Sequence, residues 1–449
     1  MIDDSIGIKG IFDNPSIKNW EEITKKMLKT DDLDNKLLFK SIEQIDIYPL
    51  HTDNKFVAEL ATFPTDISIF NDQNQKKNRD EFDIDLCKIH NAGASICQEL
   101  AYLVHSFINA KKETLNISIS LDSLYFSNIA KLRAARFLLE RINEESEAST
   151  SFNFYAFNSL REQTLFDPWV NMLRNVSSSM SAIIGGANFI SSFGYDELFS
   201  HLTSQEKSKL GERQSLNHLK ILLEESHLSD VKDYSRGSYA IENLTYQFID
   251  KAWSMAKKKP LDNEADFSKE IKEISLKRFE LIRKGKSTIT GVNNFANPQE
   301  TIESIYKYKN EVIQNTKSDE LYPLRTVASE FENLRSKFNR DNKIAVVLFG
   351  DESKLSARAN FCQNYFEVLG AEVVQFSSIE KVDKGSHIVI CSTDDKYESQ
   401  LSDFIESAKD KKAKSIYVAG KYEHKDSNGC LYMGQNIYET LHRFVEESC

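Results

Sequence analysis

The sequence of 449 residues has no apolar run that approaches the roughly 18 residues of a membrane-spanning helix. It also lacks an excess of basic residues, since 57 lysines and arginines stand against 68 aspartates and glutamates, a net charge of −11. Nucleic-acid phosphates are bound by basic surfaces, so this balance argues against a nucleic-acid partner. The first residues show no basic segment followed by an apolar core, so we expect no secretory signal and no membrane association.

Cysteine is scarce and scattered, and no two cysteines form a C-x-x-C pair. Paired motifs of that kind hold metals or carry redox chemistry, so neither is expected here. We interpret the six cysteines as reduced thiols of a cytoplasmic protein that mostly fill the core. They are Cys87, Cys97, Cys362, Cys391, Cys430 and Cys449.

The chain is long enough for two or three domains, and the patterning predicts four segments. Short β-rich runs alternate with long helical runs after the N-terminal arm, which is typical of an α/β layout with a mainly parallel sheet. Six or seven candidate strands favour a (β/α) barrel of the TIM type, shortened or irregular because a full barrel has eight. The segments are an arm (1–42), a barrel-like domain (43–260), a charged helical connector (261–340) and a compact flavodoxin-like, doubly wound α/β domain (341–449).

Local signals mark several element boundaries. In the arm, Trp20, Ile23 and Met27 recur at helical spacing, after a start signal at 14–16. Asp167-Pro168 predicts a helix start and Gly185-Gly186 its end. In the connector, the string GVNNFANP (291–298) predicts a turn or crossing segment.

The loop GDESKLSAR follows the first strand of the C-terminal segment, a position where α/β domains commonly bind cofactors. It has one glycine, Gly350, and so lacks both the G-x-G-x-x-G turn and the P-loop. It has no histidine or cysteine, and no histidine lies between His227 and His387. The favoured interpretation is that Asp351, Glu352 and Ser353 are capping and first-turn residues of the following helix.

Polar residues in the barrel-like segment allow functional and structural interpretations. His90 and Asn91 follow a strand, where barrel sites lie, but a turn in which both bond nearby backbone is favoured. Lys131, Arg133 and Arg136 are close together on a helix, and we expect a solvated or interface-forming charged face.

A further cluster comprises Glu224, Glu225 and His227. No second histidine four residues on completes a zinc pattern. Acid–base chemistry is open in principle, and a structural network is favoured.

Five strings together resemble one family, the methylmalonyl-CoA mutases, and they occur in the family's order. They are KLRAARFL, DPWVNMLRN, the GGAN turn, LKILLEESHLSDVKDYSRGSYAIENLT and KAWSMA. The resemblance covers most of residues 40–290 and continues into the C-terminal segment. It implies a (β/α) barrel that holds acyl-CoA and a C-terminal cobalamin-binding domain. It also implies interconversion of methylmalonyl-CoA and succinyl-CoA, in propionate metabolism, by a radical rearrangement that uses adenosylcobalamin.

Departures from the family pattern indicate which member the chain resembles. The catalytic chain binds cobalt through an Asp-x-His-x-x-Gly loop, whereas positions 351–356 here read Asp-Glu-Ser-Lys-Leu-Ser. The active-site histidine four residues before Ala-Gly-Ala is replaced by Lys88, and His90 lies two residues before Ala92, as expected of the small subunit. ARANFCQNYFEVLGAEV (357–373) also resembles the small subunit. Much of the early barrel, which lines the family's CoA channel, is missing between 51 and 82.

The resemblance therefore implies the small (β) subunit of a heterodimeric mutase. The partner would be the large subunit, which would carry adenosylcobalamin, substrate and chemistry, and the arm and the helix at 126–146 would contribute to the interface. This chain would bind no cofactor or metal and supply no catalytic residue. Its vestigial cobalamin-loop positions would be Asp351, Ser353, Ser392 and Gly420.

Two alternatives stay open. The chain could be a cobalamin-dependent acyl-CoA mutase in its own right, because the missing loop histidine does not exclude base-on binding. Lys88 and the shortened barrel count against that. It could instead be a binding module whose C-terminal domain docks a chaperone or activator of the mutase.

Overall fold

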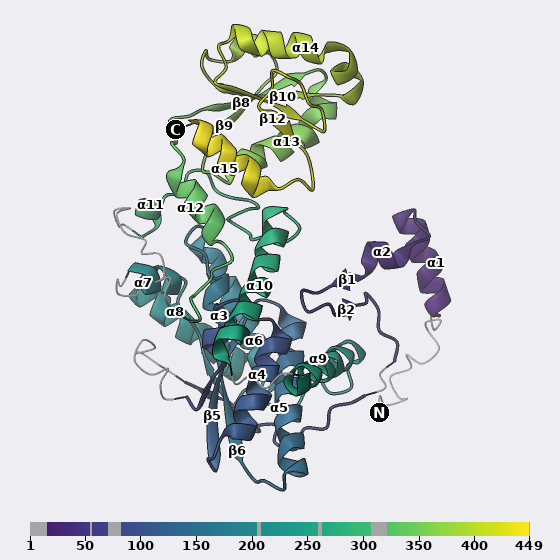
Figure 1. Cartoon of the computed structure of the whole chain (residues 1–449), viewed down its shortest axis with the longest axis vertical. Coiled ribbons are helices and arrows are strands. Elements are labelled where there is room, and N and C mark those ends of the chain that lie inside the picture. Colours follow the sequence, from purple (N-terminus) through teal and green to yellow (C-terminus); the bar gives the residue numbers. More distant parts are fainter. Residues whose placement is uncertain are drawn as a thin grey trace.

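The structure, a computed structural model, describes residues 16–53, 56–70, 82–203, 208–258, 263–306 and 321–448. Two five-stranded parallel sheets, each flanked by helices, lie toward opposite ends of its long axis (Figure 1). The α/β architecture with parallel sheets is thus confirmed. Within the described residues, no helix combines the length and apolar character needed to cross a membrane.

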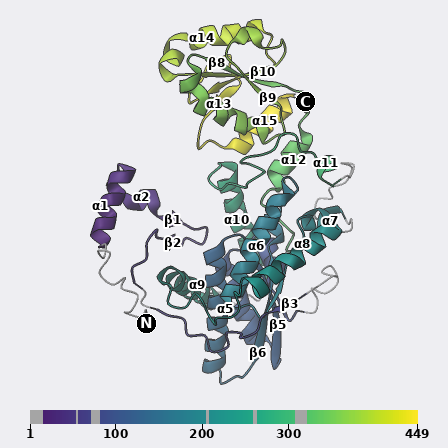
Figure 2. The same cartoon turned by 180° about the vertical axis from the view of Figure 1, so that it is seen from behind.

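The N-terminal arm contains two helices and a small antiparallel pair of strands: α1 (Ile17–Leu28), α2 (Leu33–Leu37), β1 (Phe39–Lys40) and β2 (Asp46–Ile47). The predicted helix start is confirmed, because Ser16 caps α1 by accepting a hydrogen bond from the Asn19 amide at 3.1 Å. No residue of α1 is buried, and Ile23 and Met27 are 60% and 77% exposed. Figures 1 and 2 show α1 and α2 standing away from both sheets.

The first sheet has the order β3-β7-β6-β5-β4, and all its pairs are parallel. Its strands are β3 (Ser68–Ile69), β4 (Ile84–Asp85), β5 (Thr114–Leu121), β6 (Ser151–Asn158) and β7 (Phe189–Ser191). The long central pair is in register from Thr114↔Ser151 to Leu121↔Asn158. Among the described residues, the edge strands β3 and β4 do not pair with each other, so the predicted closure into a barrel is not confirmed. Residues 71–81, inside the segment where the early barrel is expected to be missing, lie outside the description.

Helices and short helical turns alternate with the strands of the first sheet or follow them. They are α3 (Leu86–Asn91), α4 (Ile96–Asn109), α5 (Tyr125–Glu145), η3 (Leu160–Glu162), α6 (Pro168–Gly185), α7 (Glu197–Thr203), α8 (Lys209–Lys220), η4 (Ile221–Glu225) and α9 (Tyr239–Lys258). The predicted bounds of α6 are confirmed. Asp167 precedes Pro168 at its start, and Gly186 closes it in a left-handed conformation with φ 85°.

The prediction of a charged face on α5 is wrong, because Lys131, Arg133 and Arg136 are each at most 1% exposed. α5 packs against α4, α6 and α9, so these cations need internal partners. Arg133 pairs with Glu242 of α9 at 2.7 Å and also with Asp233. The partners are distant in sequence, which is why the spacing along the helix gave no sign of them.

The connector contains α10 (Glu264–Arg283), α11 (Ile302–Tyr306) and α12 (Ser329–Lys337). The turn predicted at 291–298 is confirmed, and Gly291 has a left-handed φ of 84°. The Glu332 carboxylate of α12 accepts a hydrogen bond from the backbone N–H of Leu165, after β6, at 2.6 Å. Glu332 thus ties α12 to the first sheet, and burial raises its pKa to about 7.

We expect Glu332→Gln to remove a pH dependence of stability. The raised pKa means that the fold favours the neutral acid, so its contribution is complete below about pH 4.5 and is lost as pH rises through about 7. Glutamine keeps an acceptor oxygen but cannot ionise. Relative to the parent chain, the variant should gain roughly 3 kcal/mol of unfolding free energy between these pH values. Denaturant unfolding of both proteins at pH 4.5, 6 and 8 measures this change. A difference in unfolding free energy between variant and parent that stays constant with pH would contradict the prediction.

The second sheet has the order β12-β11-β10-β8-β9, and all its pairs are parallel. Its strands are β8 (Ile344–Phe349), β9 (Val373–Phe376), β10 (His387–Ser392), β11 (Ser415–Ala419) and β12 (Gly429–Leu431). The helices are α13 (Glu352–Glu367), η5 (Ile379–Lys381), α14 (Asp394–Asp410) and α15 (Ile437–Ser448). Separate apolar clusters lie on its two faces, one with α13 and α15 and one with α14, so the sheet is doubly wound. The strand order reverses between β8 and β10, where such sheets commonly bind ligands.

Candidate functional site

The loop after β8 caps a helix, as predicted. The Asp351 carboxylate accepts hydrogen bonds from the Ser353 amide at 3.1 Å and from the Ser353 hydroxyl at 2.8 Å. These bonds favour the ionised form and hold the pKa of Asp351 below its usual value. Both residues are exposed. The side chains that the sequence marks as vestigial are therefore engaged with each other.

The other two vestigial positions lie at the same carboxyl edge of the sheet. Ser392 ends β10 and is fully buried; its hydroxyl donates to the Phe349 carbonyl at 2.7 Å and its amide donates to the Tyr397 hydroxyl at 2.8 Å. Gly420 follows β11 with φ 122°, and its amide donates to the Leu431 carbonyl at 2.8 Å. The structure thus gathers the four positions at one edge, as the order of the strands requires.

Side chains of the chain itself lie over part of this edge, since the Tyr422 ring is 3.2 Å from the position that a Cβ on Gly420 would take. The rings of Tyr397 and Tyr422 are 4.7 Å apart, and the Arg358 guanidinium lies 5.7 Å from the Tyr397 ring centre. Arg358 also donates to the Ser392 carbonyl and, at 2.8 Å, to Asp394. These side chains offer phenol, guanidinium, hydroxyl and carboxylate groups, without the imidazole that would ligate the cobalt of a cobalamin. The residues present therefore do not fit that cofactor in the family's His-on form.

A buried polar cluster lies at the carboxyl end of β4 in the first sheet. His90, 2% exposed on α3, places Nδ1 2.9 Å from Glu99 and Nε2 2.8 Å from the Ser159 hydroxyl. Glu99 also accepts from the Lys131 ammonium at 2.6 Å. The prediction that His90 bonds nearby backbone in a turn is wrong, because it lies in a helix and its partners are side chains. Asn91, in the same helix, accepts at its carbonyl from the Arg325 amide at 2.9 Å.

The charge states in this cluster follow from burial. Burial, with Arg161 and Lys131 nearby, lowers the pKa of His90 well below its ordinary value, so its imidazole is neutral near pH 7. Burial raises the pKa of Glu99, and Lys131 opposes that shift. Both ring nitrogens of His90 have partners within the cluster, which ties α3 to α4 and to the segment after β6. Lys88, which the sequence resemblance sets at the family's active-site position, has its ammonium 5.3 Å from the centre of the Tyr322 ring.

A cavity of about 690 Å³ adjoins the cluster at the same edge of the first sheet. Arg161 and Arg278 reach it, but both guanidinium groups donate inward, to the carbonyls of Ala94 and Gly93 at 2.8 Å each. Burial lowers the pKa of Arg278 to about 10. Residues 39–43 of the arm also line the cavity. Sequence reasoning missed Arg161, although its place directly after a strand was a usable signal.

The acidic cluster Glu224, Glu225 and His227 does not form the expected structural network. All three residues are exposed, and the His227 imidazole lies beside Asp230, with Nδ1 and Oδ2 3.2 Å apart. The three residues lie at and just after the end of η4, where solvent reaches their charged groups. Among the described residues, no group of three histidines, cysteines, aspartates or glutamates could hold a metal ion.

Comparison with known proteins supports the resemblance that the sequence motifs indicate. The methylmalonyl-CoA mutase family model matches residues 57–346, more than half of the chain. The chain belongs to the methylmalonyl-CoA mutase family. Several curated mutase relatives are small subunits, as the sequence resemblance predicted. The match extends through the first sheet, the connector and the start of β8.

Three relatives illustrate the extent of similarity. The methylmalonyl-CoA mutase small subunit of Porphyromonas gingivalis is 29% identical over 411 residues, which cover 81% of this chain and 65% of that protein. The probable methylmalonyl-CoA mutase small subunit of Mycobacterium tuberculosis is 25% identical over 74% of this chain and 58% of its own length. The 2-hydroxyisobutanoyl-CoA mutase large subunit of Aquincola tertiaricarbonis is 24% identical over 69% of this chain and 56% of its own length. The chain thus spans less than two thirds of the length of these relatives.

Proposed function

We propose that this chain is the small, non-catalytic subunit of a heterodimeric, adenosylcobalamin-dependent methylmalonyl-CoA mutase. It stabilises a large subunit that carries the cofactor, the substrate and the chemistry. The observation that carries this proposal is the carboxyl edge of the second sheet. Tyr397, Tyr422 and Arg358 cover it, and Ser353 stands where the family has its cobalt-binding histidine.

The second sheet supports descent from a cobalamin-binding domain. Numbered along the chain, its strands have the order 2-1-3-4-5, which is also that of flavodoxin-like sheets. The positions of the family's cobalamin loop, Asp351 and Ser353, still lie at the strand-order reversal. We therefore interpret the domain as one that keeps the fold and has replaced the ligand-binding side chains.

The arm supports a subunit partner. Its helix α1 exposes Ile17, Ile23, Met27 and Leu28, between 41% and 77% each, and Phe39 is 63% exposed. Permanent heterodimers commonly bury about 2,000 Å² or more, with an apolar centre. By contrast, the chain itself buries the middle of α5, between Asn128 and Glu140. The exposed ends of this helix carry one large apolar side chain, Phe126 at 61%, and the charged residues Arg141 and Glu144. We place the proposed interface on the arm.

Co-expression with a candidate large subunit tests this assignment. We expect a 1:1 complex on size-exclusion chromatography, and we expect Ile23→Ser with Met27→Ser to weaken it about 100-fold, through the lost burial of two large apolar side chains. Lys18→Ser, on the opposite face of α1, is the matched control and should leave the complex intact. Another protein in place of a large subunit in pull-downs would support the docking-module alternative instead. Equal association of the double variant and the control would count against the arm.

Restoring one ligand should not restore the cofactor site. We expect Ser353→His to bind no adenosylcobalamin, because Tyr397 and Tyr422 still cover the edge. The measurement is the corrin absorbance that co-elutes with protein after incubation, with Ser353→Ala as the control. Stoichiometric corrin on the histidine variant would contradict the view that the edge is closed, and corrin on the parent chain would favour an independently active mutase.

A further inference from the structure

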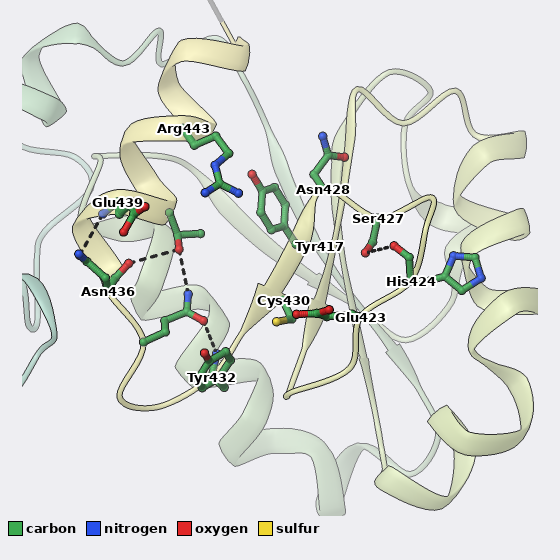
Figure 3. Close-up of a pocket in the computed structure, with 13 residues that line it drawn as sticks. Tyr417, Glu423, His424, Ser427, Asn428, Cys430, Tyr432, Asn436, Glu439 and Arg443 are labelled. Carbon is green, nitrogen blue, oxygen red and sulfur yellow. Dashed lines mark hydrogen bonds between the residues drawn. The ribbon is translucent and has the colours of Figure 1, made fainter.

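A second cavity, of about 460 Å³, lies beside β12 at the edge of the second sheet (Figure 3). Its walls come from β11, the loop before β12, β12 itself and α15. It is separate from the covered edge between β8 and β10, and the proposed subunit role makes no use of it. Cavities of 300–1,000 Å³ with a few convergent polar groups are typical of small-molecule sites.

Two hydrogen-bond donors meet in this cavity without an acceptor. Tyr417 is 1% exposed, yet its hydroxyl has no hydrogen-bond partner among the described residues. Burial raises the pKa of Tyr417, so the phenol stays protonated and can donate. Figure 3 shows that hydroxyl lying toward the guanidinium of Arg443, which forms no hydrogen bond or ion pair with the described part of the chain. Arg443 is exposed, so water can satisfy its guanidinium, but the buried Tyr417 hydroxyl has no such access. A buried donor without a partner is costly, so the retention of this hydroxyl points to an external acceptor.

The other side of the cavity is acidic. Glu423 lies next to Cys430 in Figure 3, away from Arg443. A second carboxylate, Glu439, lies on α15 one turn before Arg443, on the same side as the guanidinium. The Glu423 charge adds to burial in raising the pKa of the Cys430 thiol. Two carboxylates would repel a polyanion. The cavity therefore suits a ligand that carries a negative group at one end and a positive group at the other.

We propose that this cavity binds a small amino-carboxylate zwitterion. The ligand carboxylate accepts from the Tyr417 hydroxyl and the Arg443 guanidinium, a charge-assisted pair that is stronger than a neutral hydrogen bond. The ligand ammonium faces Glu423. Arginine suits the carboxylate end because its planar fork of donors matches carboxylate geometry.

Cys430 supplies the readout. It is partly exposed in the cavity, whereas the other described cysteines are buried. The full chain is alkylated with iodoacetamide, and modification of Cys430 is followed by peptide mass spectrometry with increasing β-alanine. We expect β-alanine to slow the modification at lower concentration than acetate or ethylamine at equal ionic strength, because only β-alanine contacts both ends.

Variants decide whether the named residues are responsible. We expect Arg443→Gln to raise the half-protecting concentration of β-alanine about tenfold or more, and Tyr417→Phe to raise it several-fold. Tyr417→Phe should not lower Tm, because it removes a hydroxyl that has no hydrogen-bond partner among the described residues. Arg213→Gln, at an exposed position of α8, is the matched control and should bind as the parent does. Absence of protection, equal protection by acetate, or equal protection of the Arg443 variant and the control would each overturn the proposal.

Discussion

Arg133→Met should lower the free energy of unfolding by about 3–5 kcal/mol, the usual cost of removing one partner of a buried ion pair. The Arg133 guanidinium is fully buried, and it pairs with Glu242, which is also fully buried, and with Asp233. Methionine fills most of the volume but leaves the Glu242 carboxylate without its cation. Urea unfolding followed by circular dichroism measures the change in the midpoint concentration of urea.

Arg141→Met is the matched control for that experiment. Arg141 lies on the same helix and pairs with Glu144, but both side chains are more than half exposed. Exposed pairs of this kind contribute little to stability, so the midpoint should barely move. Similar shifts for the two variants would mean that the Arg133 pairs are not desolvated as the structure indicates.

Gly93→Ala should be nearly as damaging, at about 2–5 kcal/mol, through two separate effects. Gly93 has φ 112°, a conformation that costs other residues roughly 1–2 kcal/mol. An added Cβ would also lie 2.6 Å from the Ser275 Cβ of α10, an overlap that costs about 1–3 kcal/mol in a packed core. Thermal unfolding of the variant measures the sum.

Ser275→Gly separates these two effects. It removes both Ser275 atoms closest to the added methyl group, so it should recover the overlap part of the loss and leave the backbone part. A double-mutant cycle of Gly93→Ala and Ser275→Gly gives the interaction free energy directly. Additive effects would contradict the close contact between the loop after α3 and α10.

Local signals in the sequence predicted local structure well. Ser16, Pro168 and Asp351 mark helix starts, and each does so through atoms within three residues. Capping depends on neighbours along the chain, so the sequence contains all the information it needs. The same holds for Gly186, whose left-handed conformation closes α6.

Contacts between segments that are distant in the sequence could not be predicted. Lys131, Arg133 and Arg136 have the spacing of a solvated helix face, and only the positions of Glu99, Glu242 and the 56–63 segment make them internal cations. A charged side chain is predicted to be exposed unless its buried partner is known, because charged residues are rarely buried unpaired. The prediction for His90 was wrong for the same reason, because its partners Glu99 and Ser159 come from two other parts of the chain.

The candidate site was predicted in part. The sequence indicated the missing cobalt ligand at Ser353, because that absence is local. It gave no sign that Tyr397 and Tyr422 would cover the edge, since they follow different strands and meet only through the strand order. The Tyr417 hydroxyl, which has no hydrogen-bond partner among the described residues, could not be predicted either, because its surroundings come from several separate elements.

Mutase turnover by the purified chain, alone and mixed with a large subunit, tests the central claim most directly. The assay supplies methylmalonyl-CoA and adenosylcobalamin and follows formation of succinyl-CoA. We predict no turnover by this chain alone at any cofactor concentration, and turnover that appears with the large subunit and is more heat-stable in the 1:1 complex than in the large subunit by itself. Turnover by the isolated chain, or a large subunit unaffected by its presence, would contradict the account.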